Sequence, residues 1–411
     1  MKEKLKILAV HNFHRKGSAS GDDQVFKSET QLLRDHGHEV IPFTTENDFF
    51  DQAGKLGKIR YALGMQWSFR YYRALKKLIR EEKPDLVHVH TFFPLFSPSI
   101  LYAAKRSHVK VIATLHDTRF VCPCATSLRD GEICNACMDG HYFRMAKYGC
   151  FKGSKLHSLY VAFVFKIHRW RKSFYKEIDR YICLNDTQMD LLKQAGYAPE
   201  KLEKKYNFVL DPLKDHPEEA PDTVPGMPEM ALPERFVVFY GRIGEEKGIR
   251  ELEKIWEQLP DIPLVVMGNG PLDEEFTAFA EKRDHIYFLG YVPREVCLSI
   301  VKKSSFVVFP SIWYEGCSMV EIEAESLGKT LVATDIGFSS ELIRDGENGF
   351  KIPRGDIQCF ADTIRKLWQD PEKAAAAGQA ARRDYEARFM PEQNYQELIG
   401  IYQKMLEEKD T

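Results

Sequence analysis

Short runs of β-branched residues alternate with stretches of helical periodicity along nearly the whole chain. In the first half, the expected strands are residues 5–10, 40–43, 85–90, 109–115 and 180–184. Between the first two, residues 22–35 place Val25, Phe26, Leu32 and Leu33 at helical spacing, and Gly37 follows as a stop signal. Strand, helix and strand repeated in this way predict a parallel α/β sheet with right-handed crossovers.

A proline-rich stretch, residues 211–234, interrupts the alternation and predicts a linker. The alternation then resumes, with expected strands at residues 235–240, 264–267, 285–289, 305–309 and 330–333. The end of the chain spaces Leu398, Ile399, Ile401, Tyr402 and Leu406 as one amphipathic helix. A chain of 411 residues is also too long for one ordinary core. The prediction is therefore two doubly wound domains, 1–210 and 235–390, followed by a terminal helix in 391–411.

Composition narrows the function classes. Hydrophobic residues make up 44% of the chain, which favours packed domains over disorder, and a formal net charge of −2 gives no global field for nucleic acid. The first residues contain no long apolar signal region, and no stretch reaches the ~18 apolar residues of a membrane span. We expect a cytoplasmic protein, in which the nine cysteines are thiols or metal ligands rather than disulfides.

Two glutamates, Glu315 and Glu323, flank an expected strand-to-helix junction. Ser318 and Glu321 have the spacing of a capping box that begins a helix near Met319, and Gly328 is placed to end it. Ligands of doubly wound sheets bind beyond the carboxyl ends of the strands, and free N–H groups at a helix start favour an anion. Carboxylates beside such a site suit hydroxyl donors, so a nucleotide sugar fits. The alternative is that both are solvated surface or capping glutamates.

Two further strand ends carry basic residues and glycines. Arg242 and Lys247 follow residues 235–240 in a turn that ends at Gly248, and both could hold a phosphate. Alone, they could equally be ordinary surface bases. Gly268 and Gly270 follow the next strand and permit close backbone approach to a ligand, but no third glycine completes a dinucleotide-binding fingerprint.

These motifs together resemble one family. GRIGEEKG, LVVMGNGP, YFLGYVP, FPSIWYEGCSMVEIEAESLGKTLVATDIG and DGENGF occur in this order, and YEARFMPEQNYQELIGIYQKML is similar to the family's last helices. The chain is identified as a member of the retaining glycosyltransferases of family 4. The resemblance implies a GT-B fold, in which two Rossmann-like domains face a central cleft and the C-terminal helix crosses back to the first domain.

The resemblance also implies residue roles, and it makes His116, Arg242, Lys247 and Glu315 the expected catalytic residues. Glu315 and Glu323 match the family's E-x7-E motif and would contact the hydroxyls of the donor sugar and the ribose. Arg242 and Lys247 would hold the diphosphate, and the base would lie near Tyr291 and Val292. Further expected donor contacts are Gly241, Gly268 and the backbone of Gly316, Cys317, Ser318 and Met319. The chain departs from the family pattern at Cys317-Ser318, Thr330 and Gly337-Phe338, which makes the identity of the donor harder to infer.

The first domain supplies two candidates. The loop HNFHRKGSASGDDQ occupies the place of the family's glycine-rich loop, with Ser20-Gly21 as the nearest match and a plain surface loop as the alternative. His116 follows an apolar strand and precedes Asp117, as in the family, which implies a role at the donor sugar. Domain closure would bring His116 toward Glu315 and exclude water. The fold requires no metal-binding D-x-D motif, so Arg242, Lys247 and a helix start would neutralise the phosphate.

Five of the cysteines lie close together: Cys122, Cys124, Cys134, Cys137 and Cys150. The C-x-C and C-x2-C pairs within an insertion at 120–150 have spacings found in tetrahedral zinc sites. A structural zinc and free buried thiols are both compatible with the pattern, and an iron–sulfur cluster is a lesser alternative.

Two segments, residues 54–83 and 155–176, interleave basic and aromatic residues. The aromatic residues singled out there are Tyr61, Trp67, Phe69, Tyr71, Tyr72, Phe163, Phe165, Trp170 and Phe174. Such segments suit an anionic lipid surface, although amphipathic core helices with solvated charge would give the same pattern. Nucleic acid fits less well, because no recognised binding motif accompanies them.

The sequence therefore predicts a membrane-peripheral glycosyltransferase. It would move a hexose or N-acetylhexosamine from a UDP-sugar, or next from GDP-mannose, to a glycan or lipid-linked glycan acceptor of surface polysaccharide synthesis. Another GT-B activity, such as an epimerase or a phosphorylase, and a non-catalytic subunit that binds nucleotide sugars are the alternatives.

Overall fold

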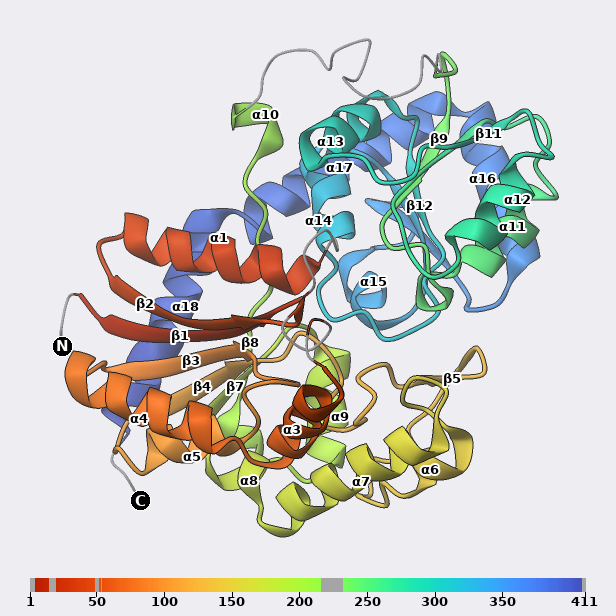
Figure 1. Ribbon diagram of the computed structural model, residues 1–411. Coiled ribbons are helices and arrows are strands. Elements are labelled where there is room, and N and C mark those ends of the chain that lie inside the picture. Colours follow the sequence, from red (N-terminus) through yellow and green to blue (C-terminus); the bar gives the residue numbers. More distant parts are fainter. Residues whose placement is uncertain (1–3, 15–19, 49–51, 53, 216–231, 409–411) are drawn as a thin grey trace. The chain divides into compact units, whose positions relative to one another are not determined.

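The chain forms two compact units. The computed structural model describes residues 4–14, 20–48, 52, 54–215 and 232–408 (Figure 1). Unit 1 comprises Met1–Ser127, Cys134–Tyr206 and Asn394–Thr411, and unit 2 comprises Leu128–Ile133 and Asn207–Gln393. Most of the predicted linker, residues 216–231, lies outside the described residues. Among those described, no helix combines the length and the apolar character that crossing a bilayer requires.

Unit 1 is built on a six-stranded parallel sheet of order β2-β1-β3-β4-β7-β8. Its strands are β1 (Lys6–Phe13), β2 (Glu39–Glu46), β3 (Leu86–Thr91), β4 (Lys110–Thr114), β7 (Arg180–Cys183) and β8 (Leu202–Lys204). The chain runs from β1 outward to β2 and then returns to β3 on the other side of β1. Ligands of such sheets bind at this reversal of strand order, beyond the carboxyl ends of the strands.

Helices cover both faces of this sheet, with α1 on one face and α4 and α5 on the other (Figure 1). Their bounds are α1 (Gly21–Asp35), α3 (Lys55–Gln66), α4 (Phe69–Glu82), α5 (Ser99–Lys105), α6 (Arg144–Tyr148), α7 (Lys155–Trp170), α8 (Ser173–Lys176) and α9 (Asp186–Gln194). Helix α1 begins because the Ser20 hydroxyl accepts a bond from the Asp23 N–H at 3.4 Å. It ends before Gly37, whose φ of 82° is the left-handed conformation that glycine adopts at low cost.

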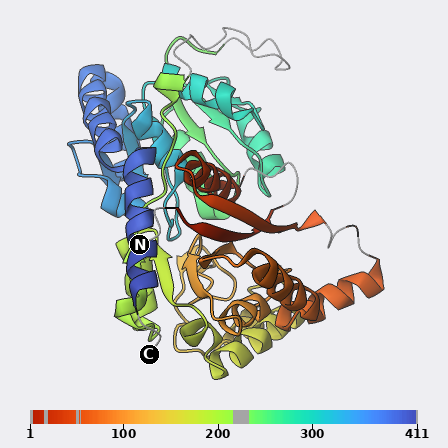
Figure 2. The same ribbon diagram turned by 90° about the vertical axis from the view of Figure 1, so that its left-hand side faces the viewer.

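The terminal helix α18 (Pro391–Glu407) belongs to unit 1 from Asn394 onward (Figure 2). Its Tyr402 hydroxyl lies 2.7 Å from His88 Nδ1 of β3, and Lys404 pairs with Glu203 of β8. Leu398, Ile401 and Tyr402 are buried, as the apolar spacing predicts. The predicted return of the last helix to the first domain is confirmed.

Unit 2 repeats the architecture with the parallel order β11-β10-β9-β12-β13-β14. Its strands are β9 (Val237–Tyr240), β10 (Leu264–Met267), β11 (Ile286–Phe288), β12 (Val307–Phe309), β13 (Leu331–Thr334) and β14 (Gly349–Ile352). The order reverses between β9 and β12, so the loops after these two strands form the expected ligand position. The ten strands predicted from the sequence are all present, whereas β8, β14 and two short strands within residues 128–133 were not predicted.

The helices of unit 2 pack around a core that includes Trp256, Phe276 and Phe306. They are α10 (Pro212–Asp215), α11 (Ile249–Trp256), α12 (Asp273–Ala280), α13 (Arg294–Lys303), α14 (Met319–Ser326), α15 (Gly337–Leu342), α16 (Ile357–Gln369) and α17 (Pro371–Arg388), with the short 3-10 helix η2 (Glu245–Lys247) after β9. A two-stranded hairpin, β5 (Leu128–Arg129) and β6 (Glu132–Ile133), joins this unit through an ion pair of 2.7 Å between Glu132 and Arg354.

Candidate functional site

The loop after β9 lies directly against the loop after β12. Gly248 closes η2 with a φ of 73°, and a Cβ atom there would lie 1.8 Å from the carbonyl oxygen of Pro310. No other residue fits this contact without moving the backbone. The two loops at the reversal of strand order are therefore held together, and they carry Lys247 and Glu315.

Lys247 and Glu315 form a close ion pair where the two loops meet. Lys247 Nζ lies 2.6 Å from Glu315 Oε1, and the Ser311 hydroxyl donates to the same oxygen at 2.7 Å. The side chains are 16% and 6% exposed, and the ammonium lies 5.7 Å from the ring centroid of Trp313. The structure thus brings together two of the predicted catalytic residues, and it adds Ser311, which the sequence did not single out.

Gly241 and Gly268 bring a third strand end to this position. Both have a φ of 140°, and a Cβ atom on Gly268 would lie 1.7 Å from the Gly241 carbonyl oxygen. The ends of β9 and β10 therefore approach more closely than side chains permit.

Helix α14 begins at Met319, as predicted, but the predicted capping box is wrong. Ser318 occupies the N-cap position, and its side chain makes no capping hydrogen bond. Glu321 is fully buried, and neither carboxylate oxygen has a hydrogen-bond partner of standard geometry. Burial, together with the charge of Glu315, raises the pKa of Glu321 to about 8, although the nearby hydroxyls of Ser339 and Ser318 and the charge of Lys247 oppose the rise. The S-x-x-E spacing could not reveal that the glutamate points into the protein.

Glu323 also lies on α14, and Arg294 holds its carboxylate. Arg294 Nη2 and Nε lie 2.6 and 2.9 Å from Glu323 Oε1. Burial raises the pKa of Glu323, and the charge of Arg294 opposes that rise. Arg294 begins α13 shortly after the exposed Tyr291 and the buried Val292, which links the predicted base loop to the predicted ribose contact. The sequence analysis missed Arg294, although its place after the base loop was a usable signal.

Arg242 is exposed to solvent, whereas Cys317, which precedes α14, is buried. The Arg242 side chain is 59% exposed, and its guanidinium lies 3.5 Å from Glu246. Cys317 is buried: its sulfur accepts from the Asn207 N–H at 3.3 Å, and its carbonyl accepts from the Asn207 side chain at 3.0 Å. Asn207 thus fixes the backbone between Glu315 and Ser318.

His116 follows β4 in unit 1 and is half-buried. The Gln188 side chain donates to the carbonyl oxygens of Leu115 and Asp117 at 3.0 and 3.2 Å, which fixes the backbone on both sides of the histidine. The Asp117 carboxylate forms an ion pair with Arg119. Burial, and then the neighbouring His90, lowers the pKa of His116 to about 3, so the ring is neutral at physiological pH.

Two family profiles match most of the chain. Glycosyltransferase Family 4 matches residues 24–209, and Glycosyl transferases group 1 matches residues 228–384. The first range covers the sheet of unit 1 from β2 to β8, and the second covers all six strands of the sheet of unit 2. Together they include His116, Lys247, Glu315 and Glu323. The chain belongs to glycosyltransferase family 4.

Curated relatives and solved structures are similar to this family 4 chain. It is 27% identical to alpha-D-kanosaminyltransferase of Streptomyces kanamyceticus, over 54% of the chain and 60% of the relative. It is also 27% identical to the capsular polysaccharide biosynthesis glycosyltransferase CapM of Staphylococcus aureus, over 44% and 49%. The chain thus spans about half the length of these relatives. The crystal structure of Anabaena HepE with UDP-glucose has a TM-score of 0.65 at 18% identity, covering 97% of this chain and 100% of that one. This similarity confirms the GT-B fold.

The predicted glycine-rich loop of the family 4 chain lies partly outside the described residues, at 15–19. Gly21 is the first residue of α1, and Asp22 and Asp23 follow it in the first turn. Their carboxylates pair with His14 at 3.1 Å and with His11 at 2.8 Å. Because two acidic side chains already occupy this helix start, they disfavour a phosphate there. The donor contact of Gly21 stays a prediction.

No disulfide joins the five described cysteines that follow His116 in the chain, and they lie close enough to influence one another. A hydrogen bond with Cys124 lowers the pKa of Cys122 to about 6, whereas burial raises the pKa of Cys137 to about 12. Within the described part of the chain, only Glu29, His88 and His90 form a group whose ligand atoms all lie within 4.8 Å of one another. The zinc site of Cys122, Cys124, Cys134, Cys137 and Cys150 stays a prediction.

Proposed function

We propose that this family 4 chain is a retaining glycosyltransferase that uses a nucleoside diphosphate sugar. It transfers a hexose or N-acetylhexosamine, with a UDP-sugar favoured over GDP-mannose, to a glycan or lipid-linked glycan acceptor of surface polysaccharide synthesis. The observation that carries the proposal is the contact between Lys247 and Glu315 at the strand-order reversal of unit 2. It places a compact cation and a hydroxyl acceptor side by side, where sheets of this kind bind their ligands.

Different residues of unit 2 can bind different parts of the donor. The first turn of α14, whose N-cap side chain makes no capping bond, offers backbone N–H groups to the diphosphate, and Arg242 and Lys247 supply positive charge. Glu315 accepts hydrogen bonds from the sugar, and Glu323, oriented by Arg294, accepts them from the ribose. His116 of unit 1 contributes a neutral imidazole to the donor sugar.

The reaction then requires no metal ion. The bond between the anomeric carbon and the diphosphate oxygen breaks, and its electron pair leaves with the nucleoside diphosphate. Arg242 and Lys247 stabilise the charge that develops on that oxygen. An acceptor hydroxyl forms the new bond on the same face of the sugar, and its proton passes to the departing phosphate. The anomeric configuration is therefore retained.

The first test is thermal stabilisation by donors. A ligand that binds only the folded state at 100 times its Kd stabilises by about 2.7 kcal/mol, so a matching donor should raise Tm by several degrees. The measurement is differential scanning fluorimetry with UDP-, GDP-, ADP- and dTDP-sugars. We expect a UDP-sugar to stabilise most and the shift to disappear in Glu315→Gln and Arg242→Ala. Arg250→Ala is the matched control, because Arg250 is an exposed arginine of unit 2 that pairs with Glu275. An equal shift in Glu315→Gln would reject the donor site.

An exposed apolar surface of unit 1 supports the proposal of a lipid-linked acceptor. On α7, Leu156, Leu159, Phe163 and Trp170 are 75%, 46%, 51% and 80% exposed, and their spacing places them on one helical face. Ile59 and Leu63 of α3 are exposed as well, and α3 contacts α7 where the Tyr160 hydroxyl donates to the Ala62 carbonyl. Other aromatic residues of these segments pack inward instead: Phe165 and Phe174 are buried, and Trp67 lies against Tyr72 and Tyr102.

We propose that this surface of α3 and α7 rests on an anionic membrane, close to a lipid-linked acceptor. Apolar side chains enter the lipid boundary, while the exposed Lys155 and Lys166 of the same helix attract anionic headgroups. A membrane suits this combination better than a nucleic acid, because the most exposed side chains are apolar.

Vesicle binding tests this surface. At low salt, the protein should sediment with phosphatidylglycerol-containing vesicles and more weakly with phosphatidylcholine alone. The triple variant Leu156→Ser, Phe163→Ser and Trp170→Ser should bind roughly 100-fold more weakly, at about 1 kcal/mol for each partly inserted side chain. Leu210→Ser is the control, because Leu210 is an exposed leucine of unit 2. Binding that the triple variant retains in full would reject the surface.

A further inference from the structure

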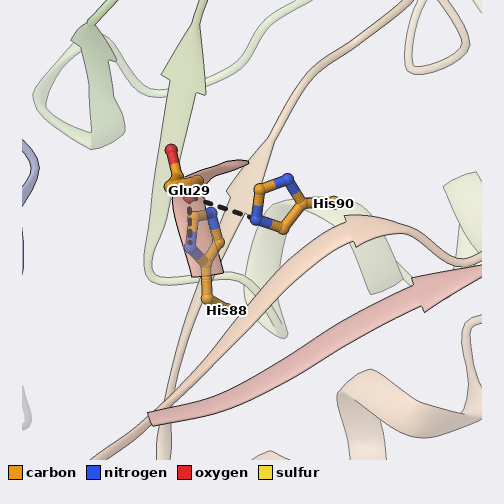
Figure 3. Close-up of side chains that lie close together, drawn as sticks. All are labelled: Glu29, His88 and His90. Carbon is orange, nitrogen blue, oxygen red and sulfur yellow. Dashed lines mark ion pairs between the residues drawn. The ribbon is translucent and has the colours of Figure 1, made fainter. Parts of the chain in front are cut away.

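A chain of polar groups leads from His116 into the interior of unit 1. His90 Nδ1 lies 3.2 Å from His116 Nε2, and the planes of the two rings differ by only 19°, so the contact is nearly coplanar. The other ring nitrogen of His90, Nε2, lies 3.2 Å from Glu29 Oε1 (Figure 3). His90 therefore bridges a buried carboxylate of α1 and the histidine that we assign to the donor sugar.

Glu29 is an ionised carboxylate inside the protein. Its side chain is 2% exposed, and Lys205 Nζ lies 3.1 Å from Oε2. Burial would raise the pKa of Glu29, but the charge of Lys205 and the contact with His90 outweigh it and hold the pKa well below its usual value. Asn394 of α18 and the carbonyl of Tyr206 accept from the same ammonium at 2.8 and 3.2 Å. The ion pair is thus fixed from several directions.

Glu29, His88 and His90 also have the spacing of a metal site, since their ligand atoms all lie within 4.8 Å of one another. Two contacts argue against a cation there. Lys205 already places a positive charge on the carboxylate, and the Tyr402 hydroxyl lies 2.7 Å from His88 Nδ1, the nitrogen that would have to bind the metal. Glu29 Oε1, which has no hydrogen bond of standard geometry, instead faces His90 Nε2 at 3.2 Å and His88 Nδ1 at 3.4 Å and needs a hydrogen-bond donor from one of them.

The hydrogen bonds of Glu29 and His90 determine which ring nitrogen of His116 carries the proton. An ionised carboxylate only accepts, and His90 Nε2 is the nearer of the two nitrogens, whereas His88 Nδ1 already lies 2.7 Å from the Tyr402 hydroxyl. His90 Nε2 therefore carries a proton toward Glu29. Because Lys205 already neutralises Glu29, a second buried positive charge on His90 would be unpaired, and His90 is neutral. Its Nδ1 then has no proton and must accept from His116. His116 therefore carries its proton on Nε2, and its Nδ1 is free of a proton.

We propose that Glu29 and His90 are positioning residues that fix the proton of His116 on Nε2, so that His116 Nδ1 accepts a hydrogen bond from a hydroxyl of the donor sugar. This inference rests on the proposed function, which gives His116 its contact with the donor. Other charged and titratable groups near these residues are already paired: Asp22, whose charge acts on His116, with His14 at 3.1 Å, His11 with Asp23 at 2.8 Å, and His88 with Thr114 at 2.8 Å. Glu29 is thus the only carboxylate described within 4 Å of His90.

The test identifies by NMR which ring nitrogen of His116 is protonated. Long-range ¹⁵N–¹H NMR of protein labelled with ¹⁵N-histidine separates Nε2–H from Nδ1–H rings, and His116→Asn assigns the His116 signal by its loss. We expect the Nε2–H form in the wild type. Two variants should convert it to a mixture with Nδ1–H: His90→Phe, which keeps a flat ring, and Glu29→Gln with Lys205→Met, which removes the buried pair together. The kcat at saturating donor should fall about 10- to 100-fold in both, the worth of one hydrogen bond to the substrate.

His168→Asn is the matched control, because it removes another buried histidine of unit 1, one bound to Ser173 and Gln66 instead. It should change neither the His116 signal nor kcat. An Nδ1–H ring in the wild type, or a ring that both variants leave unchanged, would overturn the proposal. If the variants shift the ring while His116→Ala stays fully active, the positioning stands and the assignment of His116 to the donor fails.

Metal analysis of the same samples tests the remaining alternative, which is that Glu29, His88 and His90 bind a metal ion. A metal ion present in stoichiometric amount and lost in Glu29→Gln with Lys205→Met would overturn the positioning role. A metal retained there but lost in Cys122→Ser with Cys137→Ser belongs to the cysteines and leaves the proposal intact.

Discussion

Lys247→Ala should lower kcat about 10²- to 10³-fold, the usual cost of removing one group that stabilises transition-state charge. The physical reason is the position of its ammonium, in a half-enclosed site 2.6 Å from Glu315 and beside the Trp313 ring, where little water competes for a departing phosphate. Because the charge on the leaving oxygen develops only as its bond breaks, KM for the donor should change much less than kcat. Steady-state kinetics with the donor found by thermal stabilisation would measure both.

The variant has one structural cost that the experiment must separate. Removing Lys247 leaves Glu315, which is 6% exposed, without its cation, and an unpaired buried charge costs about 3–5 kcal/mol. Thermal unfolding of Lys247→Ala, compared with that of Lys247→Ala with Glu315→Gln, which removes the pair, reports how much stability the unpaired carboxylate costs. Arg242→Ala probes the same phosphate from a side chain that is 59% exposed, so it should reduce kcat without affecting stability. A folded Lys247→Ala protein with wild-type kcat would contradict the phosphate clamp.

Most of unit 2 could be read from its sequence because its signals are local. The strands are short runs of valine and phenylalanine, and Gly248 and Gly268 occupy positions that only glycine fits. Glu315 and Lys247 could be placed at one sheet edge because both follow strands of the same parallel sheet. Strand β14 was missed because Gly349 and Lys351 interrupt the apolar pattern that identifies a buried strand.

The site's finer contacts could not be predicted because they depend on tertiary packing. The spacing of Ser318 and Glu321 does not show that Glu321 points inward. The capping box predicted from that spacing is therefore absent, and Glu321 is buried instead. The network behind His116 joins α1, β3 and the loop after β8, which are far apart in the chain. Glu29, His90 and Lys205 each look ordinary alone, and only the folded sheet brings them into contact.

Glu321→Gln should make unit 2 more stable at alkaline pH and leave it nearly unchanged at acidic pH. The pKa of Glu321 rises from an unfolded value near 4.5 to about 8, through burial and the charge of Glu315. The folded state then binds this proton more tightly than the unfolded state. Its stabilisation is complete below the unfolded pKa and is lost as the pH rises through the folded pKa. Between pH 5 and 8, this group lowers the free energy of unfolding by up to ~1.4 kcal/mol per pH unit.

A glutamine at position 321 keeps the shape of the side chain and removes the titration. Relative to wild type, Glu321→Gln should gain about 4 kcal/mol at pH 9, or roughly 8–16 °C in Tm for a unit of this size. The same comparison at pH 5 should give nearly equal Tm values. Glu274→Gln, at an exposed glutamate of α12, removes the same formal charge and should show no such dependence on pH. Burial also raises the pKa of Glu325 well above its usual value, so the variant should keep a weaker slope of the same sign. A difference in Tm that stays constant from pH 5 to pH 9 would mean that Glu321 is ionised in the folded protein, and a third carboxylate charge would then lie near Glu315.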